Sequence, residues 1–265
     1  GLGHLVWVYD DNHVSIDGPT ELSLSDDAAR RFEAYGWHVE QLGEAAEDLD
    51  AIEAGLRRAI EVDDRPSLVI IRSHIAYPSP TKTDDPSTHG YALKDADIAL
   101  TKAVLGLPAD EAFYVPDDVV DLYRAAGERG NEEREAWAKR FDAFDGDRAA
   151  LDACFAATGL EGWTTALPTW TPGEKVATRV ASGACLQAVA DVVPALVAGG
   201  ADLTSNTGTV LSGHGIQSCD DPGGRQIYFG IREHAMAATM NGMALHGGVL
   251  PIGGTFLVFS DYCRP

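Results

Sequence analysis

The chain has 265 residues, of which 45% are hydrophobic, so it can form one large domain or two modest domains with a buried core. Its 41 acidic and 20 basic residues give a formal net charge of −21, which argues against nucleic acid or an anionic membrane as a partner. No apolar run is long enough to span a membrane. The four cysteines are far apart in the sequence and form no CxxC pair, which fits a reduced, cytoplasmic protein better than a disulfide scaffold or a zinc site.

Strands and helices are expected to alternate through the first part of the chain. The apolar run at residues 5–9 is typical of a buried parallel strand, and it leads into the polar residues Asp10, Asp11 and Asn12. The next expected elements are a helix at 28–35, a strand at 37–39, a helix at 49–62 and a strand at 67–71. This alternation predicts an α/β fold of doubly wound parallel sheets with helices on both faces.

A long polar loop is expected at residues 74–91, directly after the strand at 67–71. Such loops often carry functional groups, and this one contains Lys82 and His89, although a loop histidine is often merely solvated. Further helices are expected at 94–104, at 116–125 and at 132–144, the last with Trp137 and Phe141 turned inward.

The second half of the chain contains a pattern that suits a flat heteroaromatic ligand. After an expected helix at 176–192 and a strand ending in Gly230, Glu233 lies at the start of another helix. Phe256, Phe259 and Tyr262 follow at a spacing of three. A carboxylate can hydrogen-bond a ring nitrogen, and aromatic rings can stack on the ligand. The alternative is that Glu233 is only a first-turn charge and that the aromatic residues belong to the core.

Several of these segments resemble the transketolases, which depend on thiamine diphosphate. The runs GIREHAM (230–236), HGG (246–248) and TFLVFSDY (255–262) are similar to the start of the pyrimidine-binding domain of that family. The run DDNHVSIDG (10–18) is similar to the second half of its cofactor fingerprint. The resemblance extends over nearly the whole chain. It implies the C-terminal part of a diphosphate-binding domain at 1–145, a linker at 146–174 and the N-terminal part of a pyrimidine-binding domain at 175–265.

The resemblance also implies a divalent cation, Mg²⁺ or Ca²⁺, bound by the side chain of Asn12 and the carbonyl of Val14. Oxygen ligands suit such a cation, whereas the residues alone fit an Asx-type turn equally well. The implied catalytic residues are Glu233 and His89. The implied cofactor-binding residues are Ile16, His89, Asp202, Leu203, Glu233, Phe256, Phe259 and Tyr262. The implied substrate-binding residues are His89, Arg179 and Asn206.

One segment departs from the family. Where the family has Gly-aromatic-Gly-Ser-Pro-Asn-Lys, residues 76–82 are Ala-Tyr-Pro-Ser-Pro-Thr-Lys, so two glycines are replaced and the path of this loop is left open.

The resemblance implies transfer of a two-carbon ketol unit from a ketose phosphate to an aldose phosphate, in the pentose phosphate pathway of the cytoplasm. It implies a homodimer with each active site between subunits, so this chain alone is expected to be incomplete and inactive. One alternative is a related synthase that forms dihydroxyacetone or deoxyxylulose. Another is a non-catalytic fragment that acts as an interaction subunit.

Overall fold

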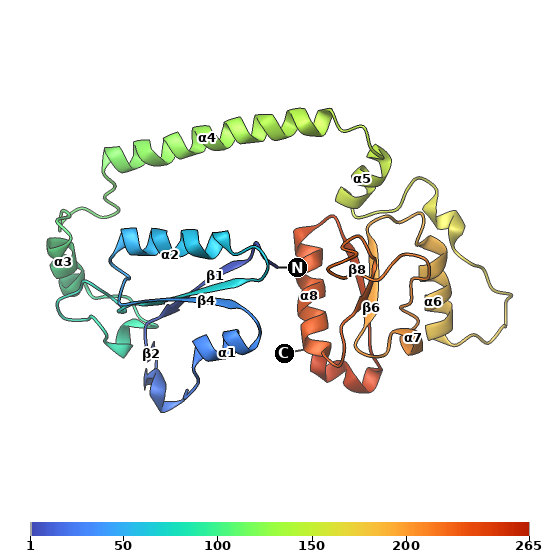
Figure 1. The fold of residues 1–265 in the computed structure, drawn as a ribbon, viewed down its shortest axis with the longest axis horizontal. Coiled ribbons are helices and arrows are strands. Elements are labelled where there is room, and N and C mark those ends of the chain that lie inside the picture. Colours follow the sequence, from blue (N-terminus) through green and yellow to red (C-terminus); the bar gives the residue numbers. More distant parts are fainter. Residues whose placement is uncertain (1, 265) are drawn as a thin grey trace. The chain divides into compact units, whose positions relative to one another are not determined.

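The computed structural model describes residues 2–264 and divides into two compact units, one ending at Gly130 and the other beginning at Asn131. Each unit is built on a parallel three-stranded sheet (Figure 1). The strand order is β1-β5-β4 in the first unit and β7-β6-β8 in the second. The predicted α/β fold with parallel sheets is therefore confirmed. Among the residues described, no helix has both the length and the apolar character that crossing a membrane requires.

The sheet of the first unit follows the predicted alternation of strand and helix. Its strands are β1 (Val6–Asp11), β4 (His38–Gly43) and β5 (Ser67–Arg72). Between them lie α1 (Ala28–Ala34) and α2 (Leu49–Glu61), on opposite faces of the sheet (Figure 1). Each helix begins where an aspartate accepts a hydrogen bond from a first-turn backbone N–H, Asp27 for α1 and Asp48 for α2. Leu68 and Val69 of the central strand are buried against these helices.

The carboxyl end of this sheet is extended by irregular segments. A small antiparallel pair, β2 (Val14–Ser15) and β3 (Gly18–Pro19), follows β1 and leads to η1 (Thr20–Leu22). The loop after β5 contains the short η2 (Pro86–Thr88) and ends at α3 (Asp95–Val104). Both segments start from parallel strand ends, which is where α/β proteins place their ligand sites.

The two helices predicted at 116–125 and 132–144 are one continuous helix, α4 (Asp117–Asp142). Gly127 and Gly130 cost about 1 kcal/mol each relative to alanine in a helix, but the intervening residues are good helix formers, so the helix continues. The prediction that Trp137 turns inward is wrong, since 51% of it is exposed. Its ring stacks on that of Phe141 with 4.9 Å between centroids.

The second unit begins with the last turns of α4 and continues through helices that frame its sheet. The elements are α5 (Arg148–Phe155), η3 (Trp163–Ala166), α6 (Thr178–Val189), β6 (Leu196–Gly200), α7 (Thr204–Thr207), β7 (Gln226–Tyr228), α8 (Glu233–His246), β8 (Leu250–Gly254) and η4 (Leu257–Cys263). The core contains Val189, Val193, Leu196, Ala198 and Leu211, with the indole of Trp163 packed against it. The segment expected as a linker, 146–174, therefore contributes Trp163 to this core.

Arg225, just before β7, and Gln226, its first residue, form side-chain hydrogen bonds with backbone groups of the core. The guanidinium of Arg225 donates to the carbonyl oxygens of Leu196 at 2.8 Å and Ala190 at 2.7 Å. Burial lowers the pKa of this group below its ordinary value. The amide of Gln226 bonds three further backbone groups of the core. Strand β6 also packs closely on β7, because a Cβ on Gly199 would lie 2.1 Å from the Ile227 carbonyl oxygen.

Candidate active site

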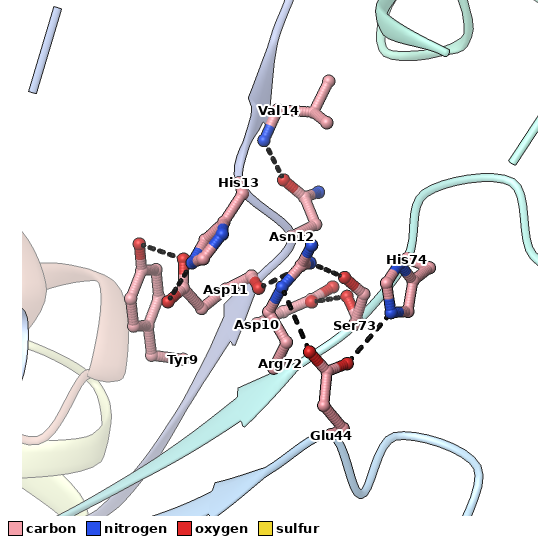
Figure 2. Close-up of polar contacts among 10 residues, drawn as sticks. All are labelled: Tyr9, Asp10, Asp11, Asn12, His13, Val14, Glu44, Arg72, Ser73 and His74. Carbon is pink, nitrogen blue, oxygen red and sulfur yellow. Dashed lines mark hydrogen bonds and ion pairs between the residues drawn. The ribbon is translucent and has the colours of Figure 1, made fainter. Parts of the chain in front are cut away.

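The predicted metal ligands of the first unit lie in one turn at the end of β1. The backbone N–H of Val14 donates to Oδ1 of Asn12 at 3.0 Å, which fixes the amide side chain in an Asx-type turn (Figure 2). Pairing of Val14 with Pro19 in the β2–β3 hairpin positions the following backbone. The Asx-type turn predicted from the residues is therefore present, and it contains both residues of the implied ligand pair.

The donor set of this turn limits the kind of cation that fits it. An amide oxygen and a backbone carbonyl are hard, neutral oxygen ligands, which suit Mg²⁺ or Ca²⁺ better than a soft metal. In the part of the chain that the structure describes, no group of three or more His, Cys, Asp or Glu side chains could hold a metal. A cation held by these two oxygens would need further hard oxygen ligands, which phosphate and water can supply.

Polar contacts with neighbouring strands hold this turn in place. The Asp11 carboxylate accepts hydrogen bonds from the Tyr9 hydroxyl at 3.3 Å and pairs with Nε2 of His13 at 3.1 Å (Figure 2). Arg72, on the adjacent strand β5, donates from Nη1 to the Asp11 carbonyl oxygen at 3.3 Å. Partial burial, followed by the Asp11 and Asp10 carboxylates, raises the pKa of Tyr9 above its ordinary value.

Ile16 and His89, which lie far apart in the sequence, are brought together. His89 follows η2, and its backbone N–H donates to the Pro86 carbonyl oxygen at 3.1 Å. The next residue, Gly90, approaches Ile16 closely, because a Cβ on Gly90 would lie 3.5 Å from Ile16 Cδ1. The first unit thus brings the residue that follows His89 into contact with Ile16, in the hairpin turn that follows Asn12.

The loop that carries His89 is ordered by a charged pair. Nζ of Lys82 contacts Oδ2 of Asp85 at 2.5 Å, and Oδ1 of Asp85 accepts from the backbone N–H of Ser87 at 2.9 Å. Ala76, at a position where the family has glycine, takes a left-handed φ of 58°. Such a conformation costs a non-glycine residue about 1–2 kcal/mol, so the surrounding contacts must stabilise it.

We expect the Lys82–Asp85 pair to be visible in a titration. The hydrogen bond from Lys82, followed by those from Ser87, lowers the pKa of Asp85 to about 2. Because the folded pKa lies below the ordinary value near 3.9, the contribution to loop stability is present above that value and is lost as the pH falls through about 2. Carbon-13 NMR of the Asp85 carboxyl should show its pKa rising toward the ordinary value in Lys82→Met.

The matched control is Lys102→Met, since Lys102 donates to the backbone carbonyl of Glu111 and not to a carboxylate. An Asp85 pKa that stays near 2 in Lys82→Met would contradict the pairing.

The second unit contains a cavity of about 540 Å³ at the carboxyl ends of its strands. Its lining combines two acidic residues with apolar and aromatic groups: Ala201, Asp202, Leu203, Ile231, Glu233, Phe259 and Tyr262. Glu233 is the first residue of α8, and Oε1 of its carboxylate accepts from the Thr255 hydroxyl at 3.3 Å. Five residues that the sequence assigned to a cofactor therefore line one cavity.

The three aromatic residues are placed by the helical repeat of η4. A 3₁₀-helix has about three residues per turn, so a spacing of three puts side chains on one face. The rings of Phe256 and Phe259 are stacked at 6.3 Å and 16°, and the ring of Tyr262 lies 6.3 Å beyond that of Phe259. The alternative that all three belong to the core is wrong, because 40% of Phe256 and 64% of Tyr262 are exposed.

Phe256 lines a separate pocket of about 350 Å³ in the same unit. This pocket contains the predicted phosphate-binding residues Arg179 and Asn206 together with hydroxyl groups: Thr178, Ser182 and Thr207. Arg179 and Ser182 are three residues apart on α6 and therefore lie on one face. Sequence reasoning missed the hydroxyl groups, although their spacing around Arg179 was a usable signal. An arginine surrounded by hydroxyl donors is suited to an oxyanion.

Asp202 and Leu203 occupy a strained turn between β6 and α7. Asp202 has a φ of 60°, a left-handed conformation that is uncommon for residues other than glycine. Strained backbone of this kind is concentrated at functional sites.

Comparison with known proteins shows which family shares this sequence. Residues 1–161 match the family model for the transketolase thiamine diphosphate binding domain, and residues 174–265 match that for the transketolase pyrimidine binding domain. The chain belongs to the transketolase family. The transketolases of Nostoc sp. and Mycobacterium leprae are each 40% identical to it, over 270 and 280 residues. Each alignment covers 100% of this chain and 40% of the relative.

Solved transketolase structures share the fold as well. A transketolase from Pichia stipitis in complex with sedoheptulose-7-phosphate is 34% identical, with a TM-score of 0.92. The transketolase of Leishmania mexicana is 34% identical, with a TM-score of 0.91. Both alignments cover 99% of this chain and 40% of the other chain, so the chain spans about two fifths of the length of these relatives.

Proposed function

We propose that this chain provides thiamine diphosphate and substrate sites for a transketolase, which moves a two-carbon ketol unit from a ketose phosphate to an aldose phosphate. The observation that carries the proposal is the cavity in which Glu233, Phe259 and Tyr262 meet Asp202 and Leu203, in a chain of this family. Solved relatives in complex with sedoheptulose-7-phosphate and xylulose-5-phosphate support a sugar phosphate as substrate. The reaction would then belong to the pentose phosphate pathway and take place in the cytoplasm.

In this proposal the second unit holds the ring system of the cofactor. Thiamine diphosphate, when bound, supplies the nucleophilic carbon and the electron sink for cleavage of a carbon–carbon bond. The carboxyl group of Glu233 would hydrogen-bond a pyrimidine ring nitrogen, and the Thr255 hydroxyl, which donates to that carboxyl group, would orient it. Phe259 and Tyr262 would pack against the ring, and Phe256, which stacks on Phe259, lines the neighbouring pocket.

The first unit would hold the diphosphate through a cation. The amide oxygen of Asn12 and the carbonyl of Val14 are its protein ligands, with Mg²⁺ as the first candidate and Ca²⁺ as the second. Ile16 provides an apolar contact for the thiazolium ring. His89, next to Ile16 through Gly90, holds or moves a proton at the substrate hydroxyl groups.

In this proposal, the two units contribute to the site from two different domains. The diphosphate-binding part is residues 1–145, the linker is 146–174 and the pyrimidine-binding part is 175–265. The active protein is a homodimer in which each site combines these domains from different subunits. This chain by itself is then expected to be inactive.

The test is ketol transfer by the full-length protein that contains these residues. Transfer from a ketose phosphate to an aldose phosphate that requires both thiamine diphosphate and Mg²⁺ is the expected result. Formation of dihydroxyacetone or deoxyxylulose phosphates instead would assign the protein to a related synthase. Absence of all three activities in a protein that binds the cofactor would overturn the proposal and favour an interaction subunit.

Replacement of Arg179 tests the substrate phosphate site. Arg179→Ala should raise KM for the phosphorylated ketose at least about tenfold, because a charge-assisted hydrogen bond to phosphate contributes about 1.5–3 kcal/mol. The kcat should change far less, since the phosphate is remote from the bond that breaks. An unphosphorylated ketose is the control substrate, and its KM should be the same in both proteins. Equal effects on the two substrates would contradict a phosphate contact.

A further inference from the structure

An unassigned cluster of charged groups lies where the loop of His89 leaves the sheet of the first unit. The ring of His74 contacts two carboxylates, with Nδ1 2.8 Å from Oδ2 of Asp84 and Nε2 2.9 Å from Oε2 of Glu44. Figure 2 shows the His74–Glu44 contact between the end of β5 and the segment after β4. The cluster therefore joins three segments that are separate in the sequence.

Only one protonation state of His74 lets the ring hydrogen-bond both carboxylates at once. An ionised carboxylate only accepts hydrogen bonds, so each ring nitrogen must donate to form both contacts. Both nitrogens carry a proton only in the imidazolium form. His74 can therefore bridge Glu44 and Asp84 as a cation, whereas the neutral ring can keep only one of the two bonds.

The surrounding charges favour this cation. The hydrogen bond with Asp84, and then that with Glu44, raises the pKa of His74 above its ordinary value, while partial burial and the charge of Arg72 oppose the rise. Nε of Arg72 also lies 3.9 Å from Oε1 of Glu44. From β1, Asp10 faces the same strand end and accepts a hydrogen bond from the Ser73 hydroxyl.

Asp84 is well placed to transmit this contact along the loop. Its backbone N–H donates to the Ile75 carbonyl oxygen at 3.0 Å, so residues 75–84 return to the point where they left the sheet. The next residue is Asp85, which bonds the backbone of Ser87 at the start of η2, and His89 follows directly. The position of Asp84 thus sets the start of the turn that presents His89.

We infer that His74 is a positioning residue, which bridges Glu44 and Asp84 and thereby fixes the part of the loop that ends at His89. The bridge itself follows from the first unit alone, and only its benefit to His89 rests on the proposed function. Because 37% of the His74 side chain and 69% of the Glu44 side chain are exposed, solvent screens the pairs, and the effect is expected on the loop more than on global unfolding.

The sign of the pH dependence follows from the raised pKa. The bridge is complete below the ordinary histidine value near 6.5 and is lost as the pH rises through the higher pKa of His74 in the folded protein. Hydrogen exchange of residues 74–91, measured by mass spectrometry in the whole chain and corrected for intrinsic rates, should therefore accelerate about two- to fivefold across this transition.

Two variants separate the bridge from a general structural role. His74→Gln should show the faster exchange at every pH, and His74→Lys, which keeps a positive charge, should keep the slower exchange past the wild-type transition. His13→Gln is the matched control, because His13 pairs with Asp11 in the same unit and not with the loop. Exchange of residues 74–91 that is independent of pH, and unchanged in His74→Gln, would overturn the inference.

Nitrogen-15 NMR provides a second, independent measurement. Both ring nitrogens of His74 should have imidazolium shifts at pH values just above the ordinary histidine pKa, and a neutral ring there would also overturn the inference. Neither measurement uses cofactor or substrate. A protein without ketol transfer would thus refute the proposed function and leave the bridge intact, whereas a neutral, unbridged His74 in an active transketolase would refute only the bridge.

Discussion

Replacing Glu233 with alanine is expected to reduce ketol transfer by the full-length protein at least about 100-fold, the lower end of the usual contribution of a proton-transfer group. The physical reason is that Glu233 lies beside Ile231, Phe259 and Tyr262 in the cavity, where the proposed function has its carboxyl group bond a ring nitrogen, and alanine provides no hydrogen-bonding group. The measurement is kcat at saturating cofactor. Glu233→Gln should be intermediate in binding, because its amide keeps a hydrogen bond, but low in kcat, because it cannot exchange a proton.

The matched control for this variant is Asp95→Ala. Asp95 is the first residue of α3, as Glu233 is of α8, so both acids interact with a helix N-terminus. Each replacement should cost about 0.3–1 kcal/mol of stability through that interaction, and only Glu233→Ala should affect turnover. If both variants retained activity within a few-fold of the wild type, Glu233 would be a first-turn charge and nothing more.

Replacing Gln226 with leucine is expected to lower the free energy of unfolding of the second unit by about 3 kcal/mol, since each unpaired buried group costs about 1–3 kcal/mol. Gln226 is 4% exposed. Its Nε2 donates to the carbonyl oxygens of Ala198 at 2.9 Å and Thr209 at 3.3 Å, and its Oε1 accepts from the N–H of Leu211 at 2.7 Å. Leucine has a similar volume but leaves these backbone groups without their partner. Urea unfolding followed by tryptophan fluorescence measures the change.

Gln187 provides the control for Gln226. Its amide also both accepts and donates, but at an exposed site. Oε1 of Gln187 accepts from the N–H of Ser212 at 2.7 Å, and Nε2 donates to the Ser212 carbonyl oxygen at 3.2 Å. Water can replace these bonds, so Gln187→Leu should cost less than about 1 kcal/mol. Equal losses in the two variants would mean that burial does not determine the cost.

The strands could be predicted because each is a short apolar run with a clear end. Residues 5–9 and 67–71 are parallel neighbours with Val6 paired with Ser67, as the alternation of strands and helices indicated. The division of α4 was wrong because Gly127, Gly130 and Asn131, which lie between the two predicted helices, weaken a helix without ending it. Trp137 was misplaced for a related reason, since an aromatic residue in a charged helix can stack locally on Phe141 without reaching a core.

The candidate site could be predicted where spacing sets geometry, and not where it depends on the path of a loop. Phe259 and Tyr262 share a face because three residues make one 3₁₀ turn, and Glu233 meets them at the start of α8. The bridge of His74 could not be predicted, because its partners lie 30 residues before it and 10 residues after it. The roles of Asn12, Arg179 and the other residues implied by the resemblance remain predictions.

Helix α4 has a consequence for how this protein could be manipulated. It contains no buried residue over its 26 positions, and the ion pairs of Arg124 with Asp121 at 3.4 Å and of Arg134 with Glu135 at 3.9 Å lie within the helix itself. Such a helix is a favourable place to cut or to insert, because few tertiary contacts would be lost. A protease acting near Arg129 would leave Asn12 and His89 on one fragment and Glu233 on the other. Each fragment could then be studied separately for the part of the site that the proposed function assigns to it.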